Sequence, residues 1–197
     1  MKTRLLPLLL FVSLTAFNVS CRSISQGKRL SKCEFRLESL QNIQLANVKI
    51  DEVKGITDLS LLDAGKITLA LARNSSLPMN MTVNIEVKNP NKKTAGLNEL
   101  KWILYIDDIQ MAEGESTQRF EVPANGTNIL PLDVNLDLKK ALKGKSRSAL
   151  LKFAFNLAGF GREASRVKIR AKPSFKVLGG TIRYPGYIKI TREFTSD

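Results

Sequence analysis

The sequence MNMTVNIEVKNPN, residues 79–91, decides how this chain folds. Its hydrophobic and polar residues alternate, so one face of the segment is apolar and the other polar, as in a half-buried β-strand. The strand is expected to end at Asn89-Pro90-Asn91, because proline has no N–H to donate to a sheet and asparagine tolerates turn conformations. The segment therefore predicts a strand followed by a sharp corner.

Residues 97–115, LNELKWILYIDDIQMAEGE, continue the same pattern. A second alternating strand is followed by a reversal at Asp107 and Asp108 and by a returning strand that reaches Gly114. The neighbours of Trp102 at the two-residue period are apolar, so we expect its ring to lie in the core between two sheets. The two segments together predict a mainly β protein.

Three segments carry a family resemblance. MTVNIEVKNPN, LNELKWILYIDDIQMAEGE and FEVPANGTNILPLDVNLDL (residues 120–138) resemble the late embryogenesis abundant type-2 family, whose core is the water-stress and hypersensitive-response (WHy) domain. The similarity extends over residues 33–174, and Asn89, Pro90 and Asn91 form its most specific motif. The resemblance implies a small Greek-key β-sandwich of the immunoglobulin or fibronectin type III kind, with one or two accessory helices. It also implies a binding or stress-protective module that is not an enzyme.

The flanking sequence predicts further elements of this sandwich. Residues 35–50 alternate in two short pieces with a break between them, which indicates a first strand that bends or carries a bulge. Residues 58–73 lack the strand period and contain good helix formers after Asp58 or Ser60, so they are expected to be helical.

The last 80 or so residues combine strand and helix patterns. Asn125-Gly126 is a dipeptide typical of hairpin turns, and Pro131 in the following alternation predicts an edge strand or a bulge. A second helix is expected after Ser146, where hydrophobic residues recur at helical spacing. A strand through Val167 should be interrupted at Pro173.

The first 20 residues have the pattern of an export signal. Basic residues precede a short apolar run, and Ser20-Cys21 follows it, so residues 1–20 are expected to be a signal peptide and Cys21 to carry a lipid such as palmitate. Asn18 departs from the aliphatic residue usual three positions before a lipidated cysteine, and plain secretion with cleavage near Ser20 is the alternative. Residues 21–32 are expected to form a lipid-anchored tether, and residues 33–197 a single domain. The expected location is the bacterial cell envelope, anchored by lipid and facing the periplasm.

The two cysteines and the absence of histidine limit the disulfides and metal sites that the chain can form. If Cys21 carries lipid, Cys33 has no disulfide partner, and we expect it to be a small buried residue at the edge of the first strand. The chain has no histidine and no Cys-x-x-Cys motif, so a transition-metal site lacks its ordinary ligands. Neither a metal nor a cofactor is expected.

Positive charge is concentrated in the last third of the chain. Residues 21–138 hold 14 Lys and Arg against 15 Asp and Glu, a net charge of −1, whereas residues 139–197 hold 15 against 3, a net charge of +12. One basic cluster crowds a single connection: Lys139, Lys140, Lys143, Lys145 and Arg147. The other alternates with apolar residues and so occupies one face of a strand: Arg166, Lys168, Arg170 and Lys172.

A row of four positive charges suits an extended anionic surface, such as lipid or polysaccharide headgroups, better than it suits one small ligand. The alternative is a solvated face that only keeps the protein soluble. Nucleic acid is not expected as a partner, because an exported protein is removed from it and the row has no interleaved aromatic platform. The expected partners are the membrane, through the lipid, and anionic headgroups or another envelope protein.

An envelope hydrolase that works through carboxylates is the alternative function. Asp107 with Asp108, and Glu113 with Glu115, are the candidate carboxylate pairs. Adjacent residues on a strand point to opposite faces, so Asp107 and Asp108 are more readily explained as residues of a hairpin turn. We therefore expect a non-catalytic module without catalytic residues.

Overall fold

A computed structural model describes residues 25–53, 56–73, 76–160, 164–177 and 180–194. Residues 1–24, with the expected signal peptide and Cys21, lie outside the described residues. A helical turn at residues 25–30 precedes the first strand. The further elements are β1 (Glu34–Leu45), β2 (Val48–Lys49), η1 (Ile56–Asp58), α2 (Leu61–Ala72), β3 (Pro78–Lys88), β4 (Ala95–Leu97), β5 (Glu99–Ile106), β6 (Ile109–Ser116), β7 (Phe120–Val122), β8 (Thr127–Asp137), α3 (Leu138–Ala141), α4 (Arg147–Leu157), β9 (Ser165–Val177), β10 (Gly180–Arg183) and β11 (Ile188–Phe194).

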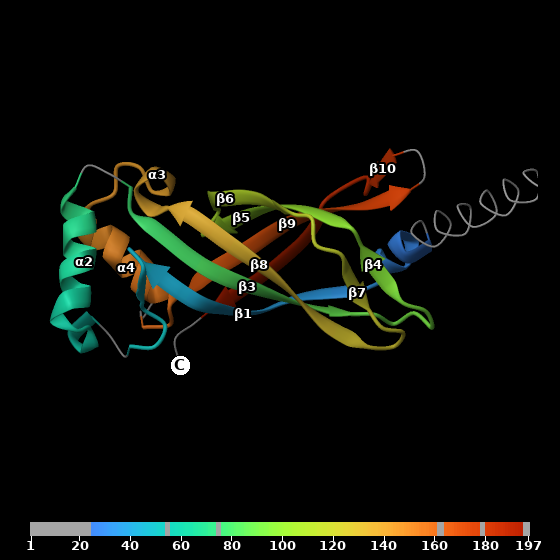
Figure 1. Cartoon of the computed structure of the whole chain (residues 1–197), viewed down its shortest axis with the longest axis horizontal. Coiled ribbons are helices and arrows are strands. Elements are labelled where there is room, and N and C mark those ends of the chain that lie inside the picture. Colours follow the sequence, from blue (N-terminus) through green and yellow to red (C-terminus); the bar gives the residue numbers. More distant parts are fainter. Residues whose placement is uncertain (1–24, 54–55, 74–75, 161–163, 178–179, 195–197) are drawn as a thin grey trace, which may run out of the picture.

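Antiparallel sheets dominate the fold. One sheet has the order β2-β1-β3-β8, a second has the order β10-β9-β5-β6 with β11 also paired to β9, and β4 pairs with β7. The two large sheets run along the length of the molecule, with α2, α3 and α4 at one end and β4, β10 and the helical turn at residues 25–30 at the other (Figure 1). The mainly β prediction is confirmed, while the Greek-key order of the immunoglobulin or fibronectin type III kind stays a prediction.

The alternating segment that opens the sequence forms the centre of the first sheet. β3 pairs with β1 on one side and with β8 on the other, so that Ile85 lies opposite both Leu37 and Leu130. All three side chains are buried. The pairing of β1 with β3 shifts register twice, between residues 37 and 39 and between residues 41 and 44, as the broken alternation of residues 35–50 predicted.

The second alternating segment forms the β5–β6 hairpin. Asp107 and Asp108 have φ angles of 50° and 63°, the two positive values that a two-residue type I′ turn requires. Trp102 on β5 is 6% exposed and belongs to the hydrophobic core, as expected. Gly114 lies opposite Trp102 on β6, and a Cβ at residue 114 would overlap the indole ring. The absence of a side chain at Gly114 therefore makes room for Trp102.

Both predicted helices are present, each begun by a serine. The Ser60 hydroxyl accepts a hydrogen bond from the Asp63 N–H at 3.1 Å, and the Ser146 hydroxyl accepts one from the Ala149 N–H at 3.2 Å. These bonds satisfy N–H groups that have no partner within the first turn of a helix.

Pro173 does not interrupt its strand, and the structure shows why. β9 runs through it, but its outer partners change there: β11 pairs with residues 165–171 and β10 with residues 174–177. Pro173 falls in the gap between the two ladders, where the N–H that proline lacks is not needed for strand pairing on that side. Pro131, by contrast, lies on β8 at the edge of its sheet, as predicted.

Two further expectations need correction. The turn at Asn125-Gly126 forms, but it joins strands of different sheets, since β7 pairs with β4 and β8 pairs along its whole length with β3. The tether expected at residues 21–32 is in part packed: residues 25–30 are helical, and Gln26 and Leu30 are buried. The folded unit therefore begins before Cys33.

Candidate functional site

The basic row of the sequence lies on the outer face of β9. Val167, Ile169 and Ala171 are buried in the core, and the residues between them point outward because side chains alternate along a strand. We call the four outward residues, Arg166, Lys168, Arg170 and Lys172, the basic row. The structure brings all four to one face.

One half of the basic row lies beside two acidic side chains, Asp107 and Asp108. Arg166 donates to the Asp108 carboxylate at 2.6 Å, and Lys168 bonds to the other oxygen of the same carboxylate. The Lys168 hydrogen bond, together with the charges of Arg166 and Lys168, lowers the pKa of Asp108 below its ordinary value. Asp107, its neighbour in the turn, accepts a hydrogen bond from the Arg166 backbone N–H at 2.9 Å. This half of the row therefore carries little net charge.

The other half of the row carries an excess of positive charge. Lys101 on β5 lies opposite Lys172, and Lys189 on β11 lies opposite Arg170. Like charges directly opposite each other on neighbouring strands are destabilising. Among the described acids, Glu115 lies beside this group, 3.5 Å from the Lys101 amine.

Tyr187 lies among these cations. The Arg170 guanidinium lies 4.3 Å and the Lys172 amine 5.5 Å from the centre of its ring, at distances where the ring attracts a cation. The Arg170 Nε is buried and has no hydrogen-bond partner among the described residues. We call this group the cationic patch: Lys101, Arg170, Lys172, Lys189 and Tyr187.

Reasoning from the sequence found the row but missed the patch. Lys101 and Lys189 come from other strands, and only their register against β9 brings them together. Tyr187 lies just before β11 and is 40% exposed. No local signal in the sequence pointed to the patch, because the exposure of Tyr187 and its position beside Arg170 follow from the fold.

The family motif, Asn89-Pro90-Asn91, lies directly after the end of β3. Asn89 is fully buried where β3 ends, and its side-chain amide donates to the carbonyls of Lys93, Val122 and Pro123 at 3.1, 3.1 and 2.8 Å. The Asn89 side-chain oxygen Oδ1 accepts hydrogen bonds from both the backbone N–H and the side-chain amide of Asn91. One side chain thus holds together three segments of the chain.

Cys33 lies beside this motif, immediately before β1. Its thiol is 3.7 Å from the Asn89 side-chain oxygen and 3.5 Å from the Arg29 carbonyl. The thiol is partly buried, and burial raises its pKa to about 11. A thiol of this kind is a poor nucleophile near neutral pH, because the reactive thiolate is scarce.

Three of the four candidate carboxylates are engaged with other residues. Asp107 and Asp108 are occupied by the hairpin turn and by Arg166 and Lys168, as described above. Glu115 pairs with Lys101 across the sheet. Within the described ranges, no group of three or more acidic, cysteine or histidine side chains could hold a metal ion.

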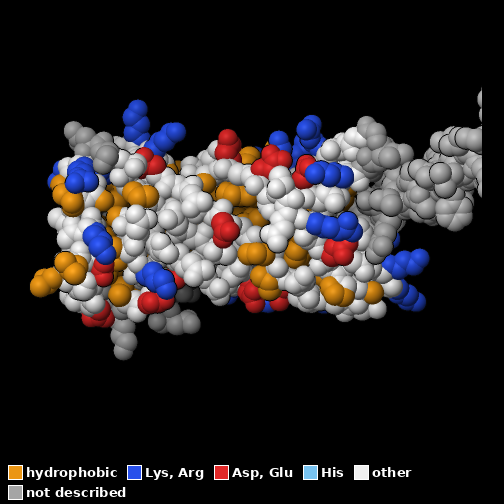
Figure 2. Space-filling view, in the orientation of Figure 1, with side chains coloured by type: hydrophobic (Ala, Val, Ile, Leu, Met, Phe, Trp, Pro, Cys, Tyr) orange, Lys and Arg blue, Asp and Glu red, His pale blue; other side chains and the backbone are white. Residues whose placement is uncertain are grey.

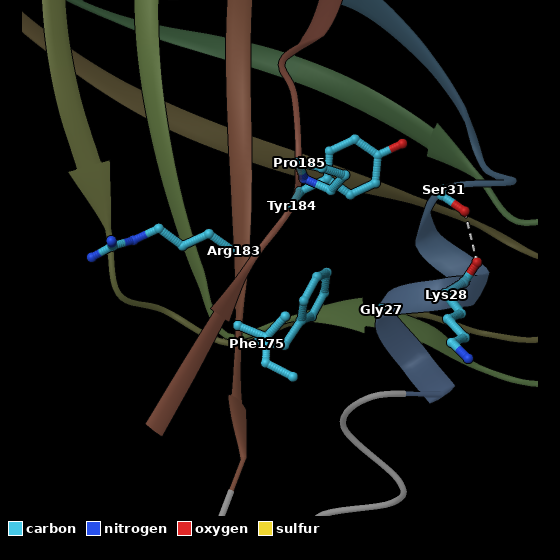
Figure 3. A pocket seen from close by; sticks show the side chains of 8 residues that line it. Gly27, Lys28, Ser31, Phe175, Arg183, Tyr184 and Pro185 are labelled. Carbon is cyan, nitrogen blue, oxygen red and sulfur yellow. Dashed lines mark hydrogen bonds between the residues drawn. The ribbon is translucent and has the colours of Figure 1, made fainter. Parts of the chain in front are cut away.

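A small apolar pocket lies under the helical turn at residues 25–30. Its volume is about 230 Å³, and the Phe175 ring, Tyr184 and Pro185 face Gly27 across it (Figure 3). A Cβ at Gly27 would lie 2.8 Å from the Phe175 ring, so this glycine allows the helical turn to approach β9. The Arg183 side chain points away from the pocket (Figure 3). The pocket is therefore a packing site that lacks converging polar groups.

Comparisons with known proteins bear on the family and the fold. A family model described as "Late embryogenesis abundant protein" matches residues 84–186. No curated protein sequence matches the chain. Within the part of the chain that the structure describes, no helix has the length and apolar character needed to cross a membrane.

Solved structures show distant similarity. A protein from Archaeoglobus fulgidus has 12% sequence identity and a TM-score of 0.37, over 82% of this chain and 98% of its own. A protein described as late embryogenesis abundant has 12% identity and a TM-score of 0.37, over 98% of this chain and 89% of its own. A protein from Arabidopsis thaliana has 12% identity and a TM-score of 0.38, over 61% of this chain and 70% of its own.

Proposed function

The chain belongs to the late embryogenesis abundant type-2 family, and from that premise we propose that it is a non-catalytic envelope lipoprotein whose cationic patch binds anionic headgroups. In this proposal the domain is a binding or stress-protective module of the bacterial cell envelope. A lipid on Cys21 holds it at a membrane, and the outer face of β9 makes the contact. The bound groups are phosphates or carboxylates of lipids or polysaccharides.

One observation carries the proposal: like charges face each other across neighbouring strands. Lys101 opposite Lys172 and Lys189 opposite Arg170 both weaken the sheet that holds them. A solubilising face does not need cations in such close register. An anionic surface would remove the repulsion, and each basic residue near such a surface contributes about 1 kcal/mol.

The position of the domain relative to Cys21 supports the same function. The described chain begins at residue 25, four residues after Cys21. Four extended residues span at most about 14 Å. A lipid on Cys21 would therefore keep the domain close to the membrane surface, and one acyl chain benefits from a second, electrostatic contact.

Vesicle binding tests the proposal. The protein comprises residues 22–197, which include every described residue and the whole core, and the vesicles contain phosphatidylglycerol in phosphatidylcholine. We expect binding at low salt that weakens as ionic strength rises. Replacing all four residues of the basic row by glutamine should abolish most of this binding. The matched control removes four exposed lysines that lie outside the row: Lys28, Lys32, Lys92 and Lys93.

A comparison of the two halves of the row makes the test sharper. Arg170→Gln with Lys172→Gln removes charge from the cationic patch and should weaken binding by roughly 30-fold, at about 1 kcal/mol for each charge. Arg166→Gln with Lys168→Gln should cost much less, because Asp107 and Asp108 already balance the charge of that half. If the two double variants bind alike, or the four-lysine control loses as much as the row variant, binding follows net charge and the patch has no special role.

A further inference from the structure

The outward face of α2 exposes leucines to an unusual degree. Leu61 is 93%, Leu62 is 80% and Leu69 is 51% exposed, whereas Ile67 and Leu71 hold the opposite side of the helix in the core. Single exposed apolar residues are ordinary, but three large ones on one face of a short helix indicate a surface that contacts something.

Cations share this face with the leucines. Leu62, Lys66, Leu69 and Arg73 recur at intervals of three and four residues, so they follow one side of the helix. α2 also contains an acidic residue, Asp63, whose carboxylate is paired with the Lys66 amine at 2.8 Å and with the Ser60 hydroxyl at 2.8 Å. Long basic side chains can lie along an apolar surface while the charge stays in water, as at a membrane interface.

The second basic cluster of the sequence extends this surface. The Lys139 amine donates to the carbonyls of Ala70 and Arg73 at 2.8 and 2.6 Å, and Arg147 lies 3.5 Å from the carbonyl of Ala72. These bonds fix the connection between α3 and α4 at the carboxyl end of α2, where cations also complement the helix dipole. Lys140 of α3 and Lys143 and Lys145 of the connection are exposed.

We propose that the outward face of α2 is a membrane-contact surface, whose leucines insert into the headgroup region of an anionic bilayer. Leucines beside cations are the composition of helices that lie in the plane of a membrane interface. A second copy of the chain fits less well, because the cations beside α2 would face the same cations on the other copy. An anionic bilayer satisfies both the leucines and the lysines.

This surface is separate from the cationic patch. α2 lies at the end of the molecule away from β4, β10 and the helical turn at residues 25–30, and hydrophobic side chains protrude beside basic ones at that end (Figures 1 and 2). The inference depends neither on the lipid at Cys21 nor on the basic row. It can therefore fail while the proposed function holds, and the reverse is also possible.

Insertion can be tested by removing the leucines. The protein comprises residues 22–197, with vesicles of phosphatidylglycerol and phosphatidylcholine. Leu61→Ser with Leu62→Ser should weaken binding at least tenfold at a salt concentration where purely electrostatic contacts have faded. Folding should not change, because both side chains are almost fully exposed. The matched control replaces two exposed isoleucines that lie outside α2, Ile109→Ser with Ile129→Ser, and should bind as the wild type does.

A fluorescence readout distinguishes insertion from mere proximity. In Leu62→Trp, the emission of the new indole should shift to shorter wavelength when anionic vesicles are added, and brominated acyl chains should quench it. Trp102 is buried in the core and gives a constant background. The shift should persist when the basic row is replaced by glutamine, at protein and lipid concentrations that saturate binding.

Three results would overturn the inference. The first is unchanged vesicle binding by the double serine variant, and the second is an emission of Leu62→Trp that does not respond to vesicles. The third is a wild-type dimer, seen by size-exclusion chromatography with light scattering, that the double serine variant dissolves. That last result would assign the face to a second copy of the chain.

Discussion

Asn89 makes several hydrogen bonds from a buried position, and its replacement tests how the end of the first sheet is held. Its side-chain amide has two N–H donors, which are shared among three backbone carbonyls at 2.8–3.1 Å, and its side-chain oxygen accepts from the Asn91 backbone N–H at 3.0 Å, all at a fully buried position. At about 1 kcal/mol for each of the two N–H donors and for the accepted backbone bond, Asn89→Ala should lower the free energy of unfolding by about 3 kcal/mol. That is a large part of the 5–15 kcal/mol typical of a domain.

Asn89→Asp should be worse at neutral pH, although the side chain has the same size. A carboxylate would face three carbonyl oxygens without a donor of its own, and burying an unpaired charge costs several kcal/mol. The introduced carboxyl would have a folded-state pKa above its unfolded value. The penalty relative to Asn89→Ala should therefore be smallest at low pH and should grow as the pH rises through the folded-state pKa.

Urea unfolding followed by tryptophan emission measures both variants, because Trp102 is the single tryptophan of the chain and is buried. Asn135→Asp introduces the same charge at an exposed position and should stay within about 0.5 kcal/mol of the wild type. The reasoning is refuted if Asn89→Ala costs less than about 1 kcal/mol, the value of one hydrogen bond. A pH profile of Asn89→Asp that runs parallel to that of Asn89→Ala would refute the electrostatic part alone.

Three other predictions follow from contacts described above. Gly114→Ala should cost about 1–3 kcal/mol in urea unfolding and shift the emission of Trp102, because the added Cβ overlaps the indole ring. In the folded chain from residue 22 onward, Cys33 should react with iodoacetamide far more slowly at pH 8 than in urea, since its pKa is raised to about 11; equal rates would contradict this. Asp108→Asn should raise affinity for anionic vesicles at low salt by roughly fivefold, about 1 kcal/mol, because it frees Arg166 and Lys168. Weaker or unchanged binding would contradict the inference that Asp108 offsets the positive charge of the basic row.

Local patterns were enough to predict most of the elements. The alternation around Ile85 identified β3, the serine before each helical segment identified α2 and α4, and Trp102 was correctly placed in the core. In each of these cases the structure is decided by contacts between residues a few positions apart or by the regular spacing of hydrophobic residues. Both signals are present in the sequence itself.

The errors arose where pairing between distant strands decides the outcome. Pro173 fits inside β9 because two separate strands, β11 and β10, pair with the same edge of β9 before and after it. The cationic patch likewise depends on which residue of β5 and β11 lies opposite each residue of β9. Register of this kind is set by the whole sheet, and a single sequence does not reveal it.

The orientation of β1 has a mechanical consequence. β1 connects the end that holds the helical turn at residues 25–30 with the end that leads through β2 to α2 (Figure 1). A strand already spans about 3.3 Å per residue, close to the limit of about 3.6 Å for a fully extended chain. Tension between the two ends would pass along this extended segment, which has little length left to give. The domain would then act as a stiff spacer that keeps whatever is attached at its ends at a nearly constant separation.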